Sequence, residues 1–429
     1  MNKNALVLLI VFLLSLPIIA QEDSTKSSEK KKKSLLDVEE MFMESEECSN
    51  ASLSFPTSSV GISFGNSKDF TGLRFNKSDC DIGTINGFNF TFWHPRDFSD
   101  SEVNGISLGL VPAASYLNGI NLGFAALLAE ESMNGINIAG LAAVSEGEIN
   151  GINFGGLALV SQGSILGINF GGLASVSQSD ISGINFGGMA LVSQETIQGI
   201  NLSTVALVSQ GGLSGINIGG VACVSQGPIY GLNLSSVALV SQSEIFGFNF
   251  GGIAVVSQES INGFNLGGIA VVSQESIEGI NLGGIAVVSE SSLMGINFGG
   301  IALVGLDGIW GMNAGGAAIV SEEDILGLNF TFGKIYTEEG VSGISIAGFK
   351  TEADYIEGVN LALAWTEVKN IDGVSVSFYN EVYGTQTGLA IGIVNYAKNL
   401  NGVQLGLINV AENNSSLFRI LPFINAHID

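Results

Sequence analysis

Carboxylates that recur at equivalent places in a repeat are the residues of this chain best suited to chemistry. Glu259 and Glu275 stand 16 residues apart, and Glu244 lies beside the same turn one repeat earlier. If the repeats stack as coils, Glu259 and Glu275 lie about 5 Å apart, as the carboxylates of a retaining glycosidase do. These three residues are also candidates for binding a cation such as Ca²⁺. Their turn positions vary between repeats and lack aromatic neighbours, so we expect a solvated acidic edge and no enzyme.

Histidine and cysteine offer little further chemistry. The two histidines, His94 and His427, lie outside the regular repeats and away from any cysteine, which argues against both a Ser-His-Asp site and a metal site. Cys48 and Cys80 flank the first irregular region, so they are candidates for a disulfide in an oxidising compartment. Cys223 stands where other repeats carry Leu, Val, Ala or Ser, and we interpret it as a small core or face residue.

The distribution of charge excludes one class of partner. The net charge is -25, and no lysine or arginine occurs from Asp97 to Gly333. Such a stretch cannot neutralise phosphates, which excludes nucleic acid and disfavours anionic polysaccharides. Glycine pairs such as Gly155-Gly156 recur through the array without a nearby lysine, so they are not phosphate-binding loops, and we predict no cofactor.

The N-terminus carries the pattern of a signal peptide. Lys3 precedes an apolar run from Ala5 to Leu16, and small residues lead to a cleavage site at Ala20–Gln21. The apolar run is shorter than the ~20 residues of a membrane-spanning helix. We therefore predict a signal peptide over residues 1–20 and an exported chain. Residues 21–49 are charged, and they form either a flexible tether or one short amphipathic helix.

A repeat of 16 residues organises the rest of the chain. A glycine recurs every 16 residues from Gly119 to Gly343 without an insertion, and the spacing then shortens to 15 and 14. Fixed-period self-similarity of this kind indicates a repeat architecture. The pattern predicts irregular N-terminal repeats and a cap over residues 50–118, regular β-repeats over 119–342, and shorter repeats with a C-terminal cap over 343–429.

Each repeat reads as β-structure when it is numbered from its glycine. Apolar and polar residues alternate, and a glycine pair at positions five and six marks a bend. Bulky apolar residues at positions two, four, seven and nine predict one face, and Gly, Asn, Ala and Val at one, three, eight and ten predict the other. Position three is asparagine in all fourteen repeats from Asn121 to Asn329. We expect these amides to form a structural ladder that includes Asn153, Asn169, Asn185, Asn201, Asn217, Asn233, Asn249, Asn265, Asn281 and Asn297.

Two all-β architectures suit this repeat. In a parallel β-solenoid each repeat is one coil, and equivalent residues stack in register. In an antiparallel transmembrane β-barrel each repeat is one long strand, and odd and even turns lie on opposite sides of the membrane. The Ser-Gln turns do not alternate between neighbouring repeats, which favours the solenoid of about twenty coils. The apolar bands would also suit a lipid-facing surface, so the barrel stays as the alternative.

The C-terminal repeats also resemble a known group of proteins. The segments Gly388-Leu389-Ala390-Ile391 and Gly406-Leu407-Ile408-Asn409, with the Gly-Ile-Asn-Phe-Gly-Gly units before them, are similar to the repeats of secreted bacterial surface-repeat proteins. The resemblance covers roughly residues 60–429. The resemblance implies placement at the cell surface or outer membrane. It implies no particular activity, because members of that group are largely of unknown function.

These observations predict a function only in outline. We expect an exported, non-enzymatic repeat scaffold that acts through extended β faces in adhesion, interaction or a structural role. The alternative is an outer-membrane β-barrel with a pore or structural role. The expected partners are a cell surface or outer membrane and further copies of the chain, which would associate through apolar faces. The sequence does not identify a ligand.

Overall fold

The computed structural model describes residue 48 and residues 51–428, and every element in them is a β-strand. The predicted signal peptide and the segment up to Cys48 lie outside the described residues. Within the described part of the chain, no helix is long and apolar enough to cross a membrane. The chain divides into two compact units, an N-terminal unit up to Ser203 and a C-terminal unit from Thr204.

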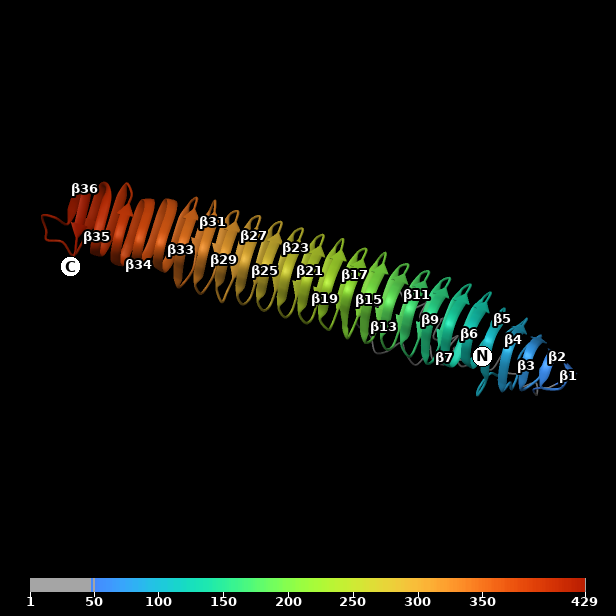
Figure 1. Cartoon of the computed structure of the whole chain (residues 1–429). Helices are drawn as coiled ribbons and strands as arrows, with labels where there is room; N and C mark the ends of the chain where they lie inside the picture. Colours follow the sequence, from blue (N-terminus) through green and yellow to red (C-terminus); the bar gives the residue numbers. More distant parts are fainter. Residues whose placement is uncertain (1–47, 49–50, 429) are drawn as a thin grey trace, which may run out of the picture. The chain divides into compact units, whose positions relative to one another are not determined.

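The N-terminal unit begins with one strand per coil and continues with two. Its first strands are β1 (Ser52–Pro56), β2 (Val60–Gly65), β3 (Phe70–Asn76), β4 (Thr84–Thr91), β5 (Glu102–Gly109), β6 (Ala113–Gly123) and β7 (Ala126–Ala139). Short and long strands then alternate: β8 (Ala142–Ser145), β9 (Glu148–Gly155), β10 (Ala158–Ser161), β11 (Ile165–Gly171), β12 (Ala174–Ser177), β13 (Ile181–Gly187), β14 (Ala190–Ser193) and β15 (Thr196–Ser203). Figure 1 shows these strands following one another in sequence order.

The C-terminal unit continues the alternation of short and long strands. The short strands are β16 (Ala206–Ser209), β18 (Ala222–Ser225), β20 (Ala238–Ser241), β22 (Ala254–Ser257), β24 (Ala270–Ser273), β26 (Ala286–Ser289), β28 (Ala302–Gly305), β30 (Ala318–Val320) and β32 (Lys334–Tyr336). The long strands are β17 (Gly212–Gly219), β19 (Ile229–Ser235), β21 (Ile245–Gly251), β23 (Ile261–Gly267), β25 (Ile277–Gly283), β27 (Leu293–Gly299), β29 (Ile309–Gly315), β31 (Ile325–Thr331) and β33 (Gly340–Ala347). The last strands are β34 (Lys350–Ile391), β35 (Val394–Ala411) and β36 (Ile420–His427).

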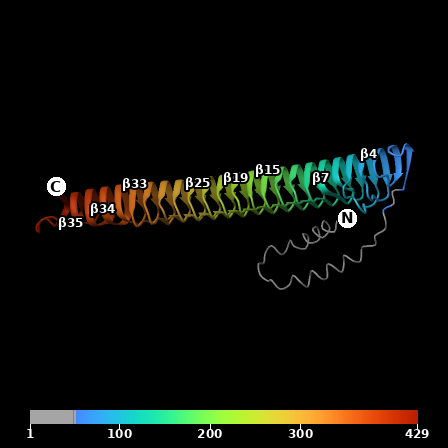
Figure 2. The ribbon, with the colours of Figure 1, turned by 90° about the horizontal axis from the view of Figure 1, so that it is seen from below.

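Neighbouring repeats pair in parallel and in register. In the C-terminal unit β19 pairs with β21 and β20 with β22, so that Asn233 lies opposite Asn249. The N-terminal unit pairs in the same way, for example β11 with β13. Figure 2 shows the two rows of strands that this pairing produces within each unit. The predicted parallel β-solenoid is therefore confirmed, and the antiparallel alternative is not the arrangement of this chain.

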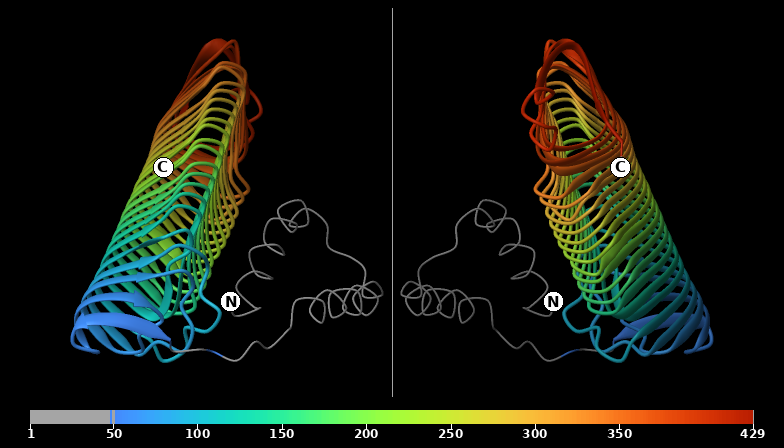
Figure 3. Two further views of the ribbon diagram at one scale, coloured as in Figure 1. Left: turned by 90° about the vertical axis from the view of Figure 1, so that its right-hand side faces the viewer. Right: turned by 90° about the vertical axis from the view of Figure 1, so that its left-hand side faces the viewer.

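Each coil encloses a narrow interior, as the views in Figure 3 show within each unit. In the repeat that starts at Gly247, Asn249, Val255 and Ile261 at positions three, nine and fifteen are buried, whereas Phe248 and Phe250 are exposed. The predicted grouping of position nine with positions two, four and seven is therefore wrong. The turn at positions six and seven breaks the alternation of side chains, so position nine points inward while the other three point outward.

A glycine at position one lets the long strand bend. From Gly119 to Gly343 this glycine has a φ between 103° and 119°, a range that L-residues rarely adopt. A Cβ atom on Gly247 would lie 2.2 Å from the carbonyl oxygen of Gly231 in the preceding coil. Close approach of successive coils therefore requires glycine here, which explains why the period of this residue is unbroken.

The two ends of the chain depart from parallel pairing. At the N-terminal end β1 pairs antiparallel with β2, and at the C-terminal end β36 pairs antiparallel with β35. Between them β34 pairs in parallel with β33 and β35. It winds on past one coil, because Ala364 and Trp365 donate hydrogen bonds to the carbonyl of Phe349, which lies one repeat earlier in the chain. The antiparallel strands cover the terminal coils, as caps do in other repeat proteins.

Candidate functional site

The asparagines at position three form a hydrogen-bonded ladder inside the coils. Asn217 donates to the Oδ1 of Asn233, which in turn donates to Asn249, both at 2.8 Å. The same bond, 2.7–2.8 Å long, joins successive residues of two runs: Asn121, Asn137, Asn153, Asn169, Asn185 and Asn201, and Asn217, Asn233, Asn249, Asn265, Asn281, Asn297, Asn313 and Asn329. These runs contain all ten predicted ladder asparagines. Each amide inside a run accepts a hydrogen bond from one neighbour and donates one to the next, as buried polar groups require, so the ladder fixes the register of the coils.

The ladder ends differently in the two units. At its C-terminal end Asn329 donates to the hydroxyl of Ser345 at 3.2 Å. A second ladder then runs on the opposite inner wall, where Asn380 donates to Asn395 and Asn395 to Asn409, both at 2.7 Å. These three asparagines are spaced by 15 and 14 residues, a signal in the sequence that our position-three analysis missed.

At the N-terminal end of the position-three column, a buried arginine stands in place of asparagine. Arg74 pairs in the sheet with Asn89 and is fully buried. Its guanidinium donates to Asp79 at 2.5 Å, to Asn89 at 2.8 Å and to Asn66 at 3.0 Å. A buried charge needs a partner and further hydrogen bonds, and both are present here. The group therefore closes the interior of the first coils and offers no open binding site.

The cysteines occupy structural positions. A disulfide joins Cys48 to Cys80 with a Cα–Cα distance of 5.6 Å. Cys223 is buried at position nine of its coil, opposite Leu207 and Leu239 in the neighbouring short strands. Burial raises the pKa of its thiol to about 12. Because the thiolate is the nucleophilic form, Cys223 is a core residue and not a reactive one.

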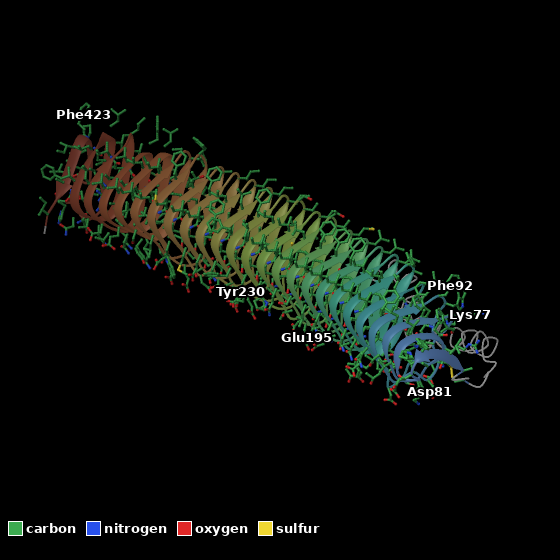
Figure 4. The ribbon with its side chains drawn as sticks, turned by 45° about the vertical axis from the view of Figure 1, so that its right-hand side comes forward. Lys77, Asp81, Phe92, Glu195, Tyr230 and Phe423 are labelled. Carbon is green, nitrogen blue, oxygen red and sulfur yellow. A yellow bond between two sulfur atoms is a disulfide. The ribbon has the colours of Figure 1, made fainter. Side chains whose placement is uncertain are left out.

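The acidic candidates lie on the turn edge of the C-terminal unit and make separate contacts. The Glu244 carboxylate accepts a hydrogen bond from Tyr230, and this contact raises the pKa of the tyrosine. The Glu259 carboxylate accepts one from Ser243 at 2.8 Å. Among the described residues no group of three or more His, Cys, Asp or Glu side chains could hold a metal ion, so Glu244, Glu259 and Glu275 do not form one. Figure 4 shows Tyr230 on this edge, where oxygen atoms gather.

A charged and aromatic cluster that the sequence analysis missed lies on the last coils. In the regular repeats the outward positions eight and ten of the short strand are alanine and valine. Beyond Val320 they become lysine, glutamate and aromatic residues, beginning with Lys334 and Tyr336 opposite Ala318 and Val320. The Lys350 cluster comprises Lys334, Tyr336, Lys350, Glu352, Trp365, Glu367, Tyr379 and Tyr383. Its signal in the sequence is that five of the seven tyrosines fall between residues 336 and 396.

Lys350 is the centre of this cluster. Its ammonium lies 2.9 Å from Glu352 and 2.5 Å from Glu367, and 4.0 Å from the centroid of the Trp365 ring. Burial alone would lower the pKa of Lys350, but the two glutamates outweigh it and raise that pKa. Burial would likewise raise the pKa of Glu352, yet hydrogen bonds from Lys334 and Lys350 lower it. The two lysines and the two glutamates therefore neutralise one another within the Lys350 cluster.

Tyrosines complete the same network. Tyr383 donates to the carboxylate of Glu367 at 3.0 Å, and burial together with this bond raises its pKa. Burial and the neighbouring carboxylate of Glu381 raise the pKa of Tyr379 to about 12. The Tyr379 ring stacks on the Trp365 ring, with 6.1 Å between the ring centroids. The cluster borders an open cavity of about 400 Å³. Its lining is charged, whereas small-molecule sites are mostly apolar, so the cavity is not a convincing ligand pocket.

The outer columns at positions two, four and seven are the main unexplained feature of the surface. Side chains in these columns are apolar along the regular repeats, and many are 36–63% exposed. Neighbouring rings stack from coil to coil. The ring centroids of Phe154 and Phe170, for example, lie 4.9 Å apart with an angle of 5° between the ring planes. Monomeric soluble proteins rarely expose contiguous apolar patches larger than a few hundred Å². These columns are therefore the candidate functional surface of the chain.

Comparison of the chain with protein-family models, with curated proteins and with solved structures found no match. The functional argument therefore depends on the geometry of the chain itself. Two surfaces on the exterior differ from an ordinary soluble surface, namely the apolar columns and the Lys350 cluster. Among the described residues, the Lys350 cluster pairs its own charges, whereas the apolar columns expose large hydrophobic side chains.

Proposed function

We propose that this chain is an exported, non-enzymatic scaffold that acts through its extended β faces, in adhesion, interaction or a structural role. The observation that supports this most strongly is the continuity of the exposed apolar columns. In the C-terminal unit they extend at position two from Ile216 to Ile344, one side chain per coil. A stack of hydrogen-bonded coils holds such a surface rigid, and rigid surfaces lose little conformational entropy on binding.

Parallel sheets offer a second line of support. They occur mostly in α/β proteins, where helices cover both faces and the buried strands are apolar on both sides. Here the inner face of the long strands packs inside the coil, and the outer face has no cover within the described residues. A partner that covers the outer face is therefore part of the proposed function.

The placement of the scaffold rests on the sequence. The signal-peptide pattern of residues 1–20 and the disulfide between Cys48 and Cys80 both suit an oxidising compartment outside the cytoplasm. The resemblance to secreted bacterial surface-repeat proteins supports the same placement. The absence of basic residues from Asp97 to Gly333 argues that the partner is not nucleic acid.

Cell fractionation tests the proposal. We expect the full chain, expressed in a bacterium with an outer membrane, to be cleaved after residue 20 and to become accessible to protease added outside the cell. A variant that lacks residues 1–20 should remain in the cytoplasm, because no other targeting signal is evident in the sequence. Accumulation of the full chain in the cytoplasm, or export of the truncated variant, would contradict the proposal.

A further inference from the structure

The apolar face of the C-terminal unit consists of the outward side chains at positions two and four of its long strands. Its exposed members are Ile216, Leu232, Phe248, Phe250, Ile280, Ile296, Phe298, Met312, Leu328, Phe330, Ile344 and Ile346. These residues stand in two parallel columns, because equivalent positions pair in register from β17 to β33. The face is thus a regular, ridged sheet surface.

The area of this face is sufficient for a stable interface. Phe248, Phe250, Phe298 and Phe330 are 63, 41, 50 and 40% exposed. A phenylalanine buries about 150–250 Å², so these four rings alone expose roughly 400 Å². A typical interface buries about 800 Å² on each partner. The four rings supply about half of that area, and the aliphatic members of the two columns can supply the remainder.

Along β17 to β33, which carry this face, the carboxylates lie at the turn with one exception. Acidic residues such as Glu259 and Glu275 occupy the turn at positions twelve to fourteen, with Glu278 at position sixteen as an exception. At about 3.3 Å per residue, positions two and four lie roughly 13–20 Å along the strand from position fourteen. That distance exceeds the Debye length of about 8 Å at physiological salt. Apart from Glu278, which lies two residues before Ile280 in β25, the carboxylates therefore let two such faces meet with little repulsion.

A lipid surface fits the face less well. Helices and strands that lie at membrane interfaces carry flanking lysine, arginine, tryptophan or tyrosine as anchors. Between Thr204 and Gly333 the unit has no basic residue, and the aromatic anchors that flank the face are two, Tyr230 and Trp310 at position sixteen. The acidic turn edge would in addition be repelled by anionic lipids. A second sheet of the same coil spacing, by contrast, matches the ridges of the face along its whole length.

We propose that the apolar face of the C-terminal unit binds the same face of a second copy of this chain. Two parallel sheets would then pack face to face about 10 Å apart, and a two-fold axis would relate the two copies because one patch contacts itself. This inference rests on the proposed function, since it names the partner of one extended β face. Self-association of this kind yields a paired scaffold whose acidic turn edges remain in solvent.

Sedimentation of the purified chain without residues 1–20 tests the inference. We expect a dimer at micromolar concentration that persists in high salt. The double variant Phe248→Lys with Phe298→Lys should weaken the dimer at least about thirtyfold, because it buries charge at the centre of the interface. The control Gln242→Lys with Gln258→Lys adds the same charge on the exposed turn edge, and it should leave the dimer unchanged.

Circular dichroism of each variant verifies that it folds, and Ile296→Gln with Met312→Gln provides a milder pair if the lysine variant does not. A monomeric wild type, or equal dissociation by the face and edge variants, would overturn the inference. Binding of a monomeric chain to phosphatidylcholine vesicles would also overturn it, in favour of a lipid partner. These outcomes can be distinguished from failure of the proposed function. A monomer that is exposed at the cell surface would refute the dimer and leave the proposed export intact. A dimer that stays in the cytoplasm would refute the export and leave the dimer intact.

Discussion

At the residue scale, asparagine at position three holds the coils in register. Asn233 is fully buried and takes part in two bonds of the ladder, one as donor and one as acceptor. We expect Asn233→Val to lower the free energy of unfolding by about 1–3 kcal/mol, because it leaves two neighbouring amides partly unpaired. Gln242→Val on the exposed turn edge should cost much less. Denaturant melts of the two variants measure the difference, and equal stability would show that the ladder does not contribute.

The thiol of Cys223 provides a second test at this scale, and its pH dependence has a definite sign. Burial raises its pKa from 9.0 to about 12 in the folded chain. The stability gained by keeping the thiol protonated is therefore fully present below pH 9 and is lost as the pH rises towards 12. We expect an alkylating reagent at pH 8 to leave Cys223 unmodified until denaturant is added. Rapid labelling of the folded chain, detected by mass spectrometry, would show that the side chain is accessible.

Some of these residues were predictable and others were not. Strict repetition of Asn121 to Asn329 indicated a ladder, because a surface position would vary. Lys350, Glu352 and Glu367 gave no such signal, because they occur once each in repeats whose spacing has changed. Their contacts depend on which short-strand positions point outward, and the periodicity alone did not determine that.

At the scale of the element, the turn and the bend of each coil govern which side chains are buried. Alternation along Phe248 to Gly251 follows the usual period of a strand, and the sequence predicts it correctly. The turn at Gly252 and Ile253 then shifts the alternation, so Val255 points inward although its column resembles those outside. Hydrophobicity could not distinguish the two, since the outward columns at positions two, four and seven are as apolar as the inward column at position nine.

The bend at position one leads to a prediction about glycine. Gly247 has a φ of 119°, and a side chain there would collide with the carbonyl of Gly231. A Cβ atom on Gly251 at position five would also lie close to a carbonyl oxygen, that of Ala254 at 2.0 Å. Gly251 nevertheless has no positive φ, and the neighbouring coil carries Ser235 at the same place. We expect Gly247→Ser to lower the free energy of unfolding by at least about 2 kcal/mol and Gly251→Ser to lower it less. Thermal and denaturant melts compare the pair, and the reverse order would contradict a role for the bend.

At the scale of the whole molecule, each coil contacts only its neighbours along the array, so stability should depend on the number of intact coils. Deletion of residues 247–262 joins Phe246 to Gly263 and restores position sixteen before position one. We expect this variant to remain folded, with a denaturant m-value reduced by the surface of one coil. Deletion of residues 247–254 removes the same rung, Asn249, but joins Phe246 at position sixteen to Val255 at position nine, which breaks the period and places apolar side chains on the wrong faces. The shorter deletion should lose far more stability than the longer one, although it removes half as many residues. Equal melting midpoints for the two deletion variants would mean that the register of the coils does not determine the fold.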